Sequence, residues 1–421
     1  MALESLLING GVPLRGEVEI SGAKNAVLPM MAATLITRER CTIRRVPDLA
    51  DVKTMVAILQ SLGAKVQHAG DTLVIEAARL KDKADYDHVR KMRGSICVLG
   101  PLLGRVRRAK VSVPGGCQIG PRPIGLHLKG MEALGAKVKT TGGYVRATGK
   151  DLRGGQVFLG GHAGPTVLGT ANVMMAAALA KGTTVIESAA CEPEITDLAV
   201  FLKAMGAKID GAGSPTITVT GVKELSGAEH EVMPDRIEAA TYAIAAVATR
   251  GEVTLKGVRP EHLTAVLDKL DSVGAKVEFK RGKMTFKRAR TLKPVDITTL
   301  PYPGFPTDVQ AQMMALLTQV PGISVITERV FESRFMHAAE LHRMGADVAV
   351  KGPSAIVKGG TALSGAQVMA SDLRASAALV IGGLMANGIT QVNRIYHLDR
   401  GYERIDDKLR GLGARVQRMQ T

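Results

Sequence analysis

The sequence predicts an α/β protein with two lobes, each an inside-out barrel in which apolar helices form the centre and strands surround them. Two observations predict this fold class. A short phrase that ends a helix and opens a strand recurs six times along the 421 residues. A second helix in each copy is apolar on nearly every face, as is typical of helices that are buried on all sides.

The recurring phrase joins an apolar residue, a glycine and a small residue to the start of a strand. An amphipathic helix precedes it, as in residues 193–209 and 259–277, and we expect the glycine to end that helix in the left-handed conformation. Successive glycines are spaced by 72, 71, 68, 71 and 68 residues, which chance does not explain. They are Gly63, Gly135, Gly206, Gly274, Gly345 and Gly413.

The apolar helix of each copy is rich in alanine and methionine, and several copies begin with Ser, Thr or Asp, residues that cap helix N-termini. A strand follows it, so the repeat of about 70 residues reads βαβαββ. Three repeats can share one core with three apolar helices at its centre. Six repeats then form two lobes with a cleft between them. An open solenoid is the alternative, but it buries fully apolar helices less well.

The net charge of +16, from 55 Lys and Arg against 39 Asp and Glu, indicates an anionic partner. The cations are dispersed, and the densest runs, at 105–108 and 280–290, lack the interleaved aromatic residues of a nucleic-acid stacking platform. We therefore expect phosphorylated small molecules rather than nucleic acid. No stretch of about 20 apolar residues is free of polar interruption, so we also expect no membrane span.

The sequence lacks the motifs of several common kinds of enzyme. The sequence has no Walker phosphate loop and no strand-coupled G-x-G-x-x-G, which disfavours P-loop nucleotide hydrolysis and dinucleotide redox chemistry, and it has no G-x-S-x-G nucleophile elbow. The cysteines have no metal-binding spacing, so we expect no metal. Cys41, Cys97 and Cys191 have apolar or strand-like neighbours, which indicates buried free thiols. These features and an N-terminus without a signal peptide indicate a reducing cytoplasm.

Charged residues lie at the predicted starts of the apolar helices, where packing does not require them. They are Lys24 with Asn25, Arg93, Asp308, and Asp372 with Arg374. Three more arginines precede other helices, namely Arg122, Arg334 and Arg400. Helix N-termini attract anions, and arginine binds phosphate or carboxylate in a bidentate manner. Together these residues predict an anion-binding cleft.

One segment, "SVPGGCQIGPRP" at 112–123, places Cys117 and Arg122 among glycines and prolines. It can form neither a helix nor a paired central strand. Taken alone, the segment is a surface turn with an incidental cysteine.

These residues carry a family resemblance. "SGAKNAVLP", "PGGCQIGPRPIGLHLKG", "YPGFPTDVQAQ", "VFESRFMHAAEL", "SDLRASAALVI" and "YHLDRGYERID" resemble the UDP-N-acetylglucosamine enolpyruvyl transferases of the EPSP synthase superfamily, colinearly over essentially the whole chain. The resemblance implies transfer of enolpyruvyl from phosphoenolpyruvate to the 3′-hydroxyl of UDP-N-acetylglucosamine, with release of phosphate, as the first committed step of peptidoglycan synthesis. It implies a tetrahedral intermediate, no cofactor, and inhibition by fosfomycin.

The resemblance also implies the lobes and the roles of residues. One lobe spans 22–233, the other joins 1–21 to 234–421, and the active site lies in the cleft between them. Cys117 is implied as the acid toward the methylene carbon and as the site of a covalent adduct, on a loop that closes as a lid. Asp308 is implied as the base near the sugar hydroxyl, or its positioner.

The remaining implied residues bind the two substrates. Those for phosphoenolpyruvate are Lys24, Asn25, Arg122, Arg334, Arg374 and Arg400. Those for UDP-N-acetylglucosamine are Arg93, Arg122, Pro123, Ile124, Gly125, Leu126, Thr166, Val167, Leu168, Gly169, Asp308 and Val330. The sequence departs from the family pattern at Gly125, where an aspartate is commoner, and at 164–170, and both departures concern nucleotide binding.

Three alternatives remain beside this interpretation. A 3-phosphoshikimate 1-carboxyvinyltransferase-like enzyme shares the repeats and phosphoenolpyruvate, but lacks the Pro-Gly-Gly-Cys lid. A nucleic-acid-binding protein would use the positive charge, and a paralogue that only binds would need an incomplete catalytic set. No obligate protein partner is evident in the sequence.

Overall fold

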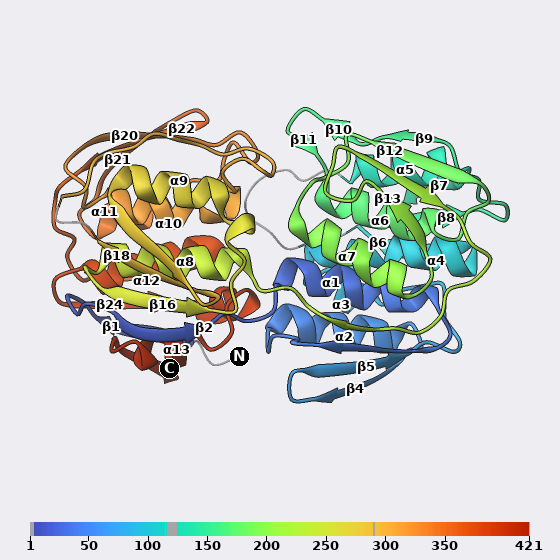
Figure 1. Cartoon of the computed structure of the whole chain (residues 1–421), viewed down its shortest axis with the longest axis horizontal. Coiled ribbons are helices and arrows are strands. Elements are labelled where there is room, and N and C mark those ends of the chain that lie inside the picture. The colour runs from blue at the N-terminus through green and yellow to red at the C-terminus, as the bar shows by residue number, and fades with distance from the viewer. Residues whose placement is uncertain (1–3, 114, 116–123, 289–290, 421) are drawn as a thin grey trace. The chain divides into compact units, whose positions relative to one another are not determined.

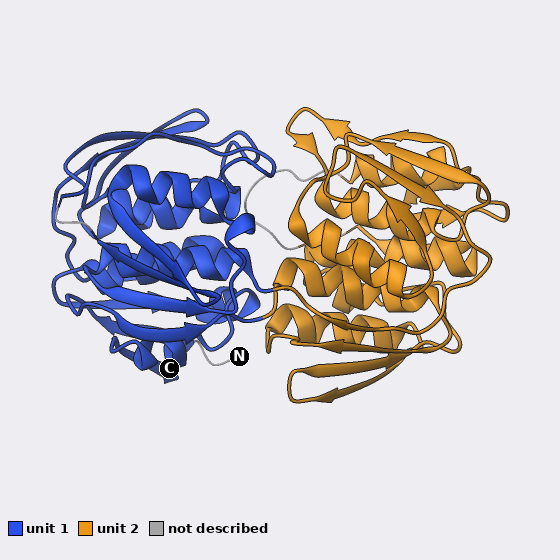
Figure 2. Cartoon of the chain, viewed as in Figure 1, with its two compact units in different colours: residues 1–21, 118–120, 234–421 blue, residues 22–117, 121–233 orange. Residues whose placement is uncertain are grey.

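The computed structural model describes residues 4–113, 115, 124–288 and 291–420, and the fold is α/β (Figure 1). The described chain divides into two compact units (Figure 2). Unit 1 contains the N-terminal residues up to Ser21 and everything from Pro234 onward, and unit 2 contains Gly22 to Met233. Each unit has its own hydrophobic core.

Unit 2 alternates short helices and strands. Its helices are α1 (Lys24–Ala33), η1 (Thr34–Ile36), α2 (Ala50–Ser61), α3 (Tyr86–Val89), η2 (Arg93–Val98), α4 (Leu99–Val106), α5 (Gly125–Ala133), α6 (Val167–Ala177) and α7 (Pro193–Ala204). Its strands are β3 (Arg40–Arg44), β4 (Lys65–Ala69), β5 (Thr72–Glu76), β6 (Arg108–Ser112), β7 (Lys137–Thr141), β8 (Tyr144–Thr148), β9 (Gln156–Phe158), β10 (Gly160–Gly161), β11 (Gly164–Pro165), β12 (Thr183–Glu187), β13 (Lys208–Asp210), β14 (Thr216–Thr220) and β15 (Glu229–Glu231).

Unit 1 is built from the same kinds of elements. Its helices are α8 (Arg236–Ala248), η3 (Pro260–His262), α9 (Thr264–Val273), α10 (Thr307–Leu317), α11 (Met336–Arg343), α12 (Leu373–Met385), η4 (Ile395–Arg400) and α13 (Ile405–Gly411). Its strands are β1 (Glu4–Asn9), β2 (Arg15–Glu19), β16 (Glu252–Lys256), β17 (Ala275–Lys280), β18 (Lys283–Arg288), β19 (Ile297–Thr298), β20 (Gly322–Thr327), β21 (Asp347–Lys351), β22 (Ser354–Gly359), β23 (Gln367–Met369), β24 (Ile389–Asn393) and β25 (Arg415–Gln420).

Over the described residues, the five four-stranded sheets share one pattern, in which one edge strand pairs parallel with its neighbour and the other pairs are antiparallel. In the sheet β17-β18-β16-β2, β16 pairs antiparallel with β18 and parallel with β2. In the sheet β23-β24-β1-β25, the N-terminal strand β1 lies between two C-terminal strands, with Leu6 opposite both Val392 and Arg418. The remaining larger sheets, over the described residues, have the orders β15-β3-β5-β4, β6-β8-β7, β13-β14-β12-β9 and β19-β20-β22-β21.

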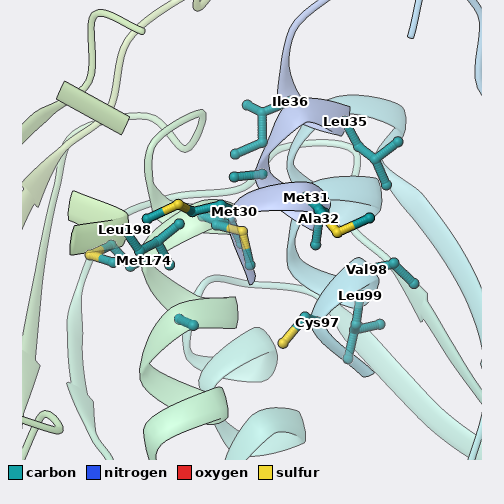
Figure 3. Packing of buried hydrophobic residues seen from close by; sticks show 14 of the residues in the cluster. Met30, Met31, Ala32, Leu35, Ile36, Cys97, Val98, Leu99, Met174 and Leu198 are labelled. Atoms are coloured by element: carbon teal, nitrogen blue, oxygen red, sulfur yellow. The ribbon is translucent and has the colours of Figure 1, made fainter. Parts of the chain in front are cut away.

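Helices fill the centre of each unit. In unit 1, α8, α10 and α12 contact one another, and every residue of α8 and of α12 is buried. In unit 2, α6 packs on α4, α1 and η2, and the core joins methionines with small and branched residues, among them Met30, Met31 and Met174 (Figure 3). Because methionine is flexible and unbranched, it fills the irregular space between such helices without aromatic side chains.

The recurring glycines have the conformation that the sequence predicts. All six have positive φ, from 85° at Gly135 to 106° at Gly274, and a strand begins within two residues of each. A side chain is strained at such φ values, so glycine is the residue that allows the sharp change from helix to strand. The second apolar segment differs from expectation, because the 3₁₀ helix η2 precedes α4 where a single helix was expected.

Candidate active site

The residue predicted as the base, Asp308, lies at the start of a buried helix of unit 1. Asp308 is the second residue of α10, and Pro306 precedes the helix in an extended conformation that proline favours. A carboxylate in the first turn interacts favourably with the helix dipole. At the start of α12, Asp372 caps the helix, and its Oδ1 accepts hydrogen bonds from the backbone N–H groups of Arg374 and Ala375 at 2.8 and 3.2 Å.

Two guanidinium groups contact the Asp308 carboxylate. Arg334 Nη1 lies 2.8 Å from Oδ1, and Arg374 Nε lies 3.3 Å from Oδ2. Arg334 Nη2 also lies 3.7 Å from Asp372 Oδ1. Arg374 is 1% exposed and Arg334 is 6% exposed, whereas the Asp308 side chain is 26% exposed. The structure therefore brings three predicted residues together, with the carboxylate as the member that solvent reaches.

The two arginines keep their charge although they are buried. Burial opposes ionisation of Arg334, but the carboxylates of Asp308 and Asp372 outweigh it and raise its pKa above the ordinary value. Burial likewise opposes ionisation of Arg374, and Tyr402 and Asp308 outweigh it, so this pKa is also raised. The cluster is therefore a paired set of permanent charges, as buried charges require.

Arg374 retains hydrogen-bonding capacity. Its guanidinium carbon lies 5.1 Å from the centroid of the Tyr402 ring, in a cation–π arrangement. Nη1 and Nη2 make no hydrogen bond of good geometry among the described residues, and the Tyr402 side chain is the polar group that lies against the guanidinium. A buried guanidinium with two such nitrogens is suited to a planar anion such as a carboxylate.

Arg400 and Val330 also belong to unit 1. Arg400 is the last residue of η4, and burial together with the Arg400 charge lowers the pKa of nearby His397. Val330 follows β20, and its backbone N–H donates to Glu328 Oε1 at 2.9 Å. Glu328 is fully buried, and sequence reasoning did not single it out. No local pattern marks this glutamate, because its partners come from separate segments.

Several predicted residues of unit 2 lie at the starts of α1, η2 and α6. Lys24 and Asn25 open α1, and Lys24 Nζ lies 3.5 Å from Asp51 Oδ2, a nearly buried carboxylate that sequence reasoning missed. Arg93 opens η2. Thr166 caps α6 by accepting a hydrogen bond from Gly169 N–H at 3.2 Å, and Val167 and Leu168 are the first residues of that helix.

A buried histidine lies beside this group. The Asn172 amide accepts from Gly100 N–H through Oδ1 and donates through Nδ2 to Ile96 O. Nδ2 also lies 2.9 Å from His127 Nδ1, so the ring nitrogen accepts and the proton resides on Nε2. Burial and then the Arg93 charge lower the pKa of His127 to about 3. The ring is therefore neutral near pH 7.

Other predicted residues are only partly placed. Ile124 precedes α5, and Gly125 and Leu126 open it. A Cβ atom at Gly125 would meet no atom of the described residues within 4 Å. Cys117, Arg122 and Pro123 lie outside the described residues. Cys41 and Cys97 are buried free thiols as expected, but Cys191 is only partly buried, because it lies in the segment just before α7.

Metal-binding clusters and membrane spans are both absent from the described ranges. No group of three or more His, Cys, Asp or Glu side chains in the described part of the chain is arranged to hold a metal ion. None of the described helices combines the length and apolar character needed to cross a membrane.

Comparison with known proteins identifies the class as carboxyvinyl transferases. The family model described as EPSP synthase (3-phosphoshikimate 1-carboxyvinyltransferase) matches residues 8–409. A relative from Carboxydothermus hydrogenoformans, UDP-N-acetylglucosamine 1-carboxyvinyltransferase 2, is 54% identical over 420 residues, covering 99% of this chain and 100% of that protein. The UDP-N-acetylglucosamine 1-carboxyvinyltransferase of Akkermansia muciniphila is 52% identical over 420 residues, covering 99% of each chain. The chain therefore belongs to the EPSP synthase family and, within it, to the UDP-N-acetylglucosamine 1-carboxyvinyltransferases.

Solved structures agree with this membership. The enolpyruvyl transferase NikO from Streptomyces tendae is 25% identical and superposes with a TM-score of 0.90, covering 100% of both chains. An EPSP synthase from Acinetobacter baumannii is 20% identical with a TM-score of 0.76, covering 99% of this chain and 100% of that one. The second likeness concerns the fold alone.

Proposed function

We propose that this chain transfers the enolpyruvyl group of phosphoenolpyruvate to the 3′-hydroxyl of UDP-N-acetylglucosamine and releases phosphate, as the first committed step of peptidoglycan synthesis. The observation that carries the proposal is the 54% identity to UDP-N-acetylglucosamine 1-carboxyvinyltransferase 2 over 99% of this chain. Both substrates are intracellular phosphorylated metabolites, so we place the reaction in the cytoplasm. Their negative charges suit a chain with a net charge of +16.

The proposed reaction is addition followed by elimination. The 3′-oxygen bonds to the central carbon of phosphoenolpyruvate while the methylene carbon gains a proton, which gives a tetrahedral intermediate. Loss of a proton from the methyl group and of phosphate then restores the double bond. Cys117 supplies the first proton and can form an adduct with phosphoenolpyruvate, and Asp308 receives the proton of the sugar hydroxyl or orients that hydroxyl.

The cluster in unit 1 supports the assignment for phosphoenolpyruvate. The buried Arg374 guanidinium, whose Nη1 and Nη2 make no hydrogen bond of good geometry among the described residues, suits the substrate carboxylate, with Arg334 nearby on Asp308. Lys24, Arg122 and Arg400 are proposed to bind its phosphate, and Asn25 is proposed to line the site beside phosphoenolpyruvate. Because both arginines of the cluster already contact Asp308, the carboxylate of the substrate and the base would be held next to each other.

The sugar nucleotide is proposed to contact both units. The cap of α6 at Thr166 presents backbone N–H groups at a helix start, which suits a diphosphate, together with Val167, Leu168 and Gly169. The segment Arg122, Pro123, Ile124, Gly125 and Leu126 and the Arg93 side chain are proposed to contact the nucleotide. Asp308 and the backbone of Val330 are proposed to contact the amino sugar.

We also propose that the chain consists of six βαβαββ repeats in two inside-out lobes of three, with the active site in a cleft between the lobes. The pairing pattern shared by the four-stranded sheets and the six glycines with positive φ support the repeats. The buried helices α8, α10 and α12 support an apolar centre.

Phosphate release with each acceptor tests the function. Purified protein is mixed with phosphoenolpyruvate and either UDP-N-acetylglucosamine or shikimate 3-phosphate. Release with the sugar nucleotide alone supports the proposal. Release with shikimate 3-phosphate alone would assign the chain to the activity named by the family model, 3-phosphoshikimate 1-carboxyvinyl transfer.

A further inference from the structure

A single buried carboxylate in unit 1 joins three segments that lie far apart in the sequence. Glu328 follows β20, is 0% exposed, and accepts four hydrogen bonds. The donors come from the end of β19, from the start of α10 and from the turn that follows Glu328 itself. A buried carboxylate is costly unless its oxygens are hydrogen-bonded. Because losing any of the four donors would leave an oxygen of Glu328 with fewer partners, the carboxylate holds the three donor segments in place.

One oxygen of Glu328 organises the turn that contains Val330. Oε1 accepts from the backbone N–H groups of Val330 and Phe331 at 2.9 and 3.0 Å, and from Thr299 Oγ1 at 2.5 Å. Thr299 Oγ1 in turn accepts from Arg329 N–H at 3.0 Å. Three consecutive backbone N–H groups of the turn are thus held by Glu328 and Thr299.

The other oxygen reaches the Asp308 cluster. Oε2 accepts from Thr307 Oγ1 at 2.9 Å, and the same hydroxyl accepts from Arg334 Nη1 at 3.0 Å. Arg334 Nη1 also donates to Asp308 Oδ1 at 2.8 Å. A chain of hydrogen bonds therefore runs from the turn through Glu328, Thr307 and Arg334 to Asp308.

We propose that Glu328 is a positioning residue that fixes the Val330 turn and the Asp308–Arg334 pair relative to each other, so that the acceptor sugar and the reacting carboxylate are aligned. The inference rests on the proposed function, because that function gives Val330 to the amino sugar and Asp308 to the hydroxyl. Each half of the network has its own link to Glu328: Thr299 holds the turn, and Thr307 holds the arginine.

The two links predict separate kinetic effects. Thr307→Val removes the link to Arg334. Thr299→Val removes the hydrogen bonds of Thr299 to Glu328 Oε1 and from Arg329 N–H, which weakens the support of the turn but leaves the bonds of Val330 and Phe331 to Glu328. We expect T307V to lower kcat about tenfold with KM for UDP-N-acetylglucosamine changed less than about twofold. We expect T299V to raise that KM about fivefold with kcat changed less than about twofold. The matched controls T307S and T299S keep the hydroxyl groups and should resemble the wild type.

The outcomes distinguish this inference from the function beneath it. Wild-type protein that releases no phosphate with UDP-N-acetylglucosamine overturns the proposed function and this inference with it. If the wild type is active but T307V and T307S have the same kcat, the inference alone is overturned. It is also overturned if T307V and T299V both lower kcat and both raise KM for UDP-N-acetylglucosamine in the same proportion. If T307V shows no cooperative thermal unfolding, the comparison of T299V with T299S tests the inference instead. Equal KM values for UDP-N-acetylglucosamine in these two variants would overturn it.

Discussion

Arg334 Nη1 lies 2.8 Å from Asp308 Oδ1, and both side chains belong to unit 1. The arginine comes from the turn before α11, whereas the aspartate opens α10, so the contact fixes two segments that carry proposed catalytic roles. A hydrogen-bonded pair of this kind orients the carboxylate, and the second contact to Arg374 leaves little freedom of rotation.

Replacing Asp308 by asparagine tests its role in proton transfer. The substituted amide would keep an oxygen for Arg334, but it could not receive a proton from the sugar hydroxyl. We expect Asp308→Asn to lower kcat by about 10²- to 10⁴-fold in the phosphate-release assay. Asp347→Asn, on the exposed strand β21, is the matched control and should retain wild-type kcat. A kcat for Asp308→Asn equal to that of this control would remove Asp308 from the chemistry.

Fosfomycin tests the assignment of Cys117. Alkylation of a cysteine requires its thiolate, and burial raises the pKa of the other thiols, that of Cys97 to about 12 and those of Cys41 and Cys191 above the ordinary value. We therefore expect the intact mass to rise by one fosfomycin adduct, and Cys117→Ser to gain none. An adduct on Cys117→Ser would show that another residue reacts.

The buried histidine of unit 2 predicts a pH dependence of stability. The pKa of His127 is lowered to about 3 in the folded protein, so the unfolded chain takes up a proton between its ordinary value, about 6.5, and pH 3 while the folded protein does not. Protonation of His127 in the unfolded chain hardly affects the stability at pH 7, and it lowers the free energy of unfolding as the pH falls below about 6.5. At pH 5 it amounts to about 2 kcal/mol of lost unfolding free energy.

Urea unfolding at pH 7 and pH 5 measures this effect. His127→Gln retains an oxygen that can accept from Asn172, but it has no titrating group, so its unfolding free energy should fall less over the same interval. His337, whose pKa burial lowers to about 4, acts in the same direction in both proteins and cancels in the comparison. Equal losses in the wild type and His127→Gln would contradict the low pKa.

The contact of α4 with α6 predicts a sharp difference between two glycines. A Cβ atom at Gly100 would lie 2.2 Å from the backbone oxygen of Asn172, whereas one at Gly411, in α13, would meet nothing within 4 Å. We expect Gly100→Ala to lower the unfolding free energy by about 1–3 kcal/mol, because the backbones of α4 and α6 would have to move apart to make room for the added methyl group. Gly411→Ala should raise it slightly, since alanine favours helix. Chemical denaturation of the two variants compares them, and similar values would argue against close packing of α4 on α6.

Local features of the structure were predictable from the sequence. The glycine in each recurring phrase carries its conformational reason with it, and helices such as α12 are apolar enough to require burial on all sides. The positions of Asp308 and Arg374 in the first turns of helices were also predicted from the local sequence. These inferences need only the neighbours of a residue along the chain.

Long-range features were not predictable in the same way. Glu328 is one acidic residue among 39, and only the fold brings Thr299 and Thr307 to its two oxygens. The pairing of β1 with β24 and β25 joins residues from opposite ends of the chain. The break between η2 and α4 also escaped prediction, because both segments have the same apolar pattern.

A competition between acceptors tests the central claim most directly. The protein is incubated with phosphoenolpyruvate and equal concentrations of UDP-N-acetylglucosamine and shikimate 3-phosphate, and the products are identified by mass spectrometry. We expect the sugar nucleotide to gain one enolpyruvyl group while shikimate 3-phosphate is recovered unchanged. Enolpyruvyl on shikimate 3-phosphate, or on neither acceptor, would contradict it.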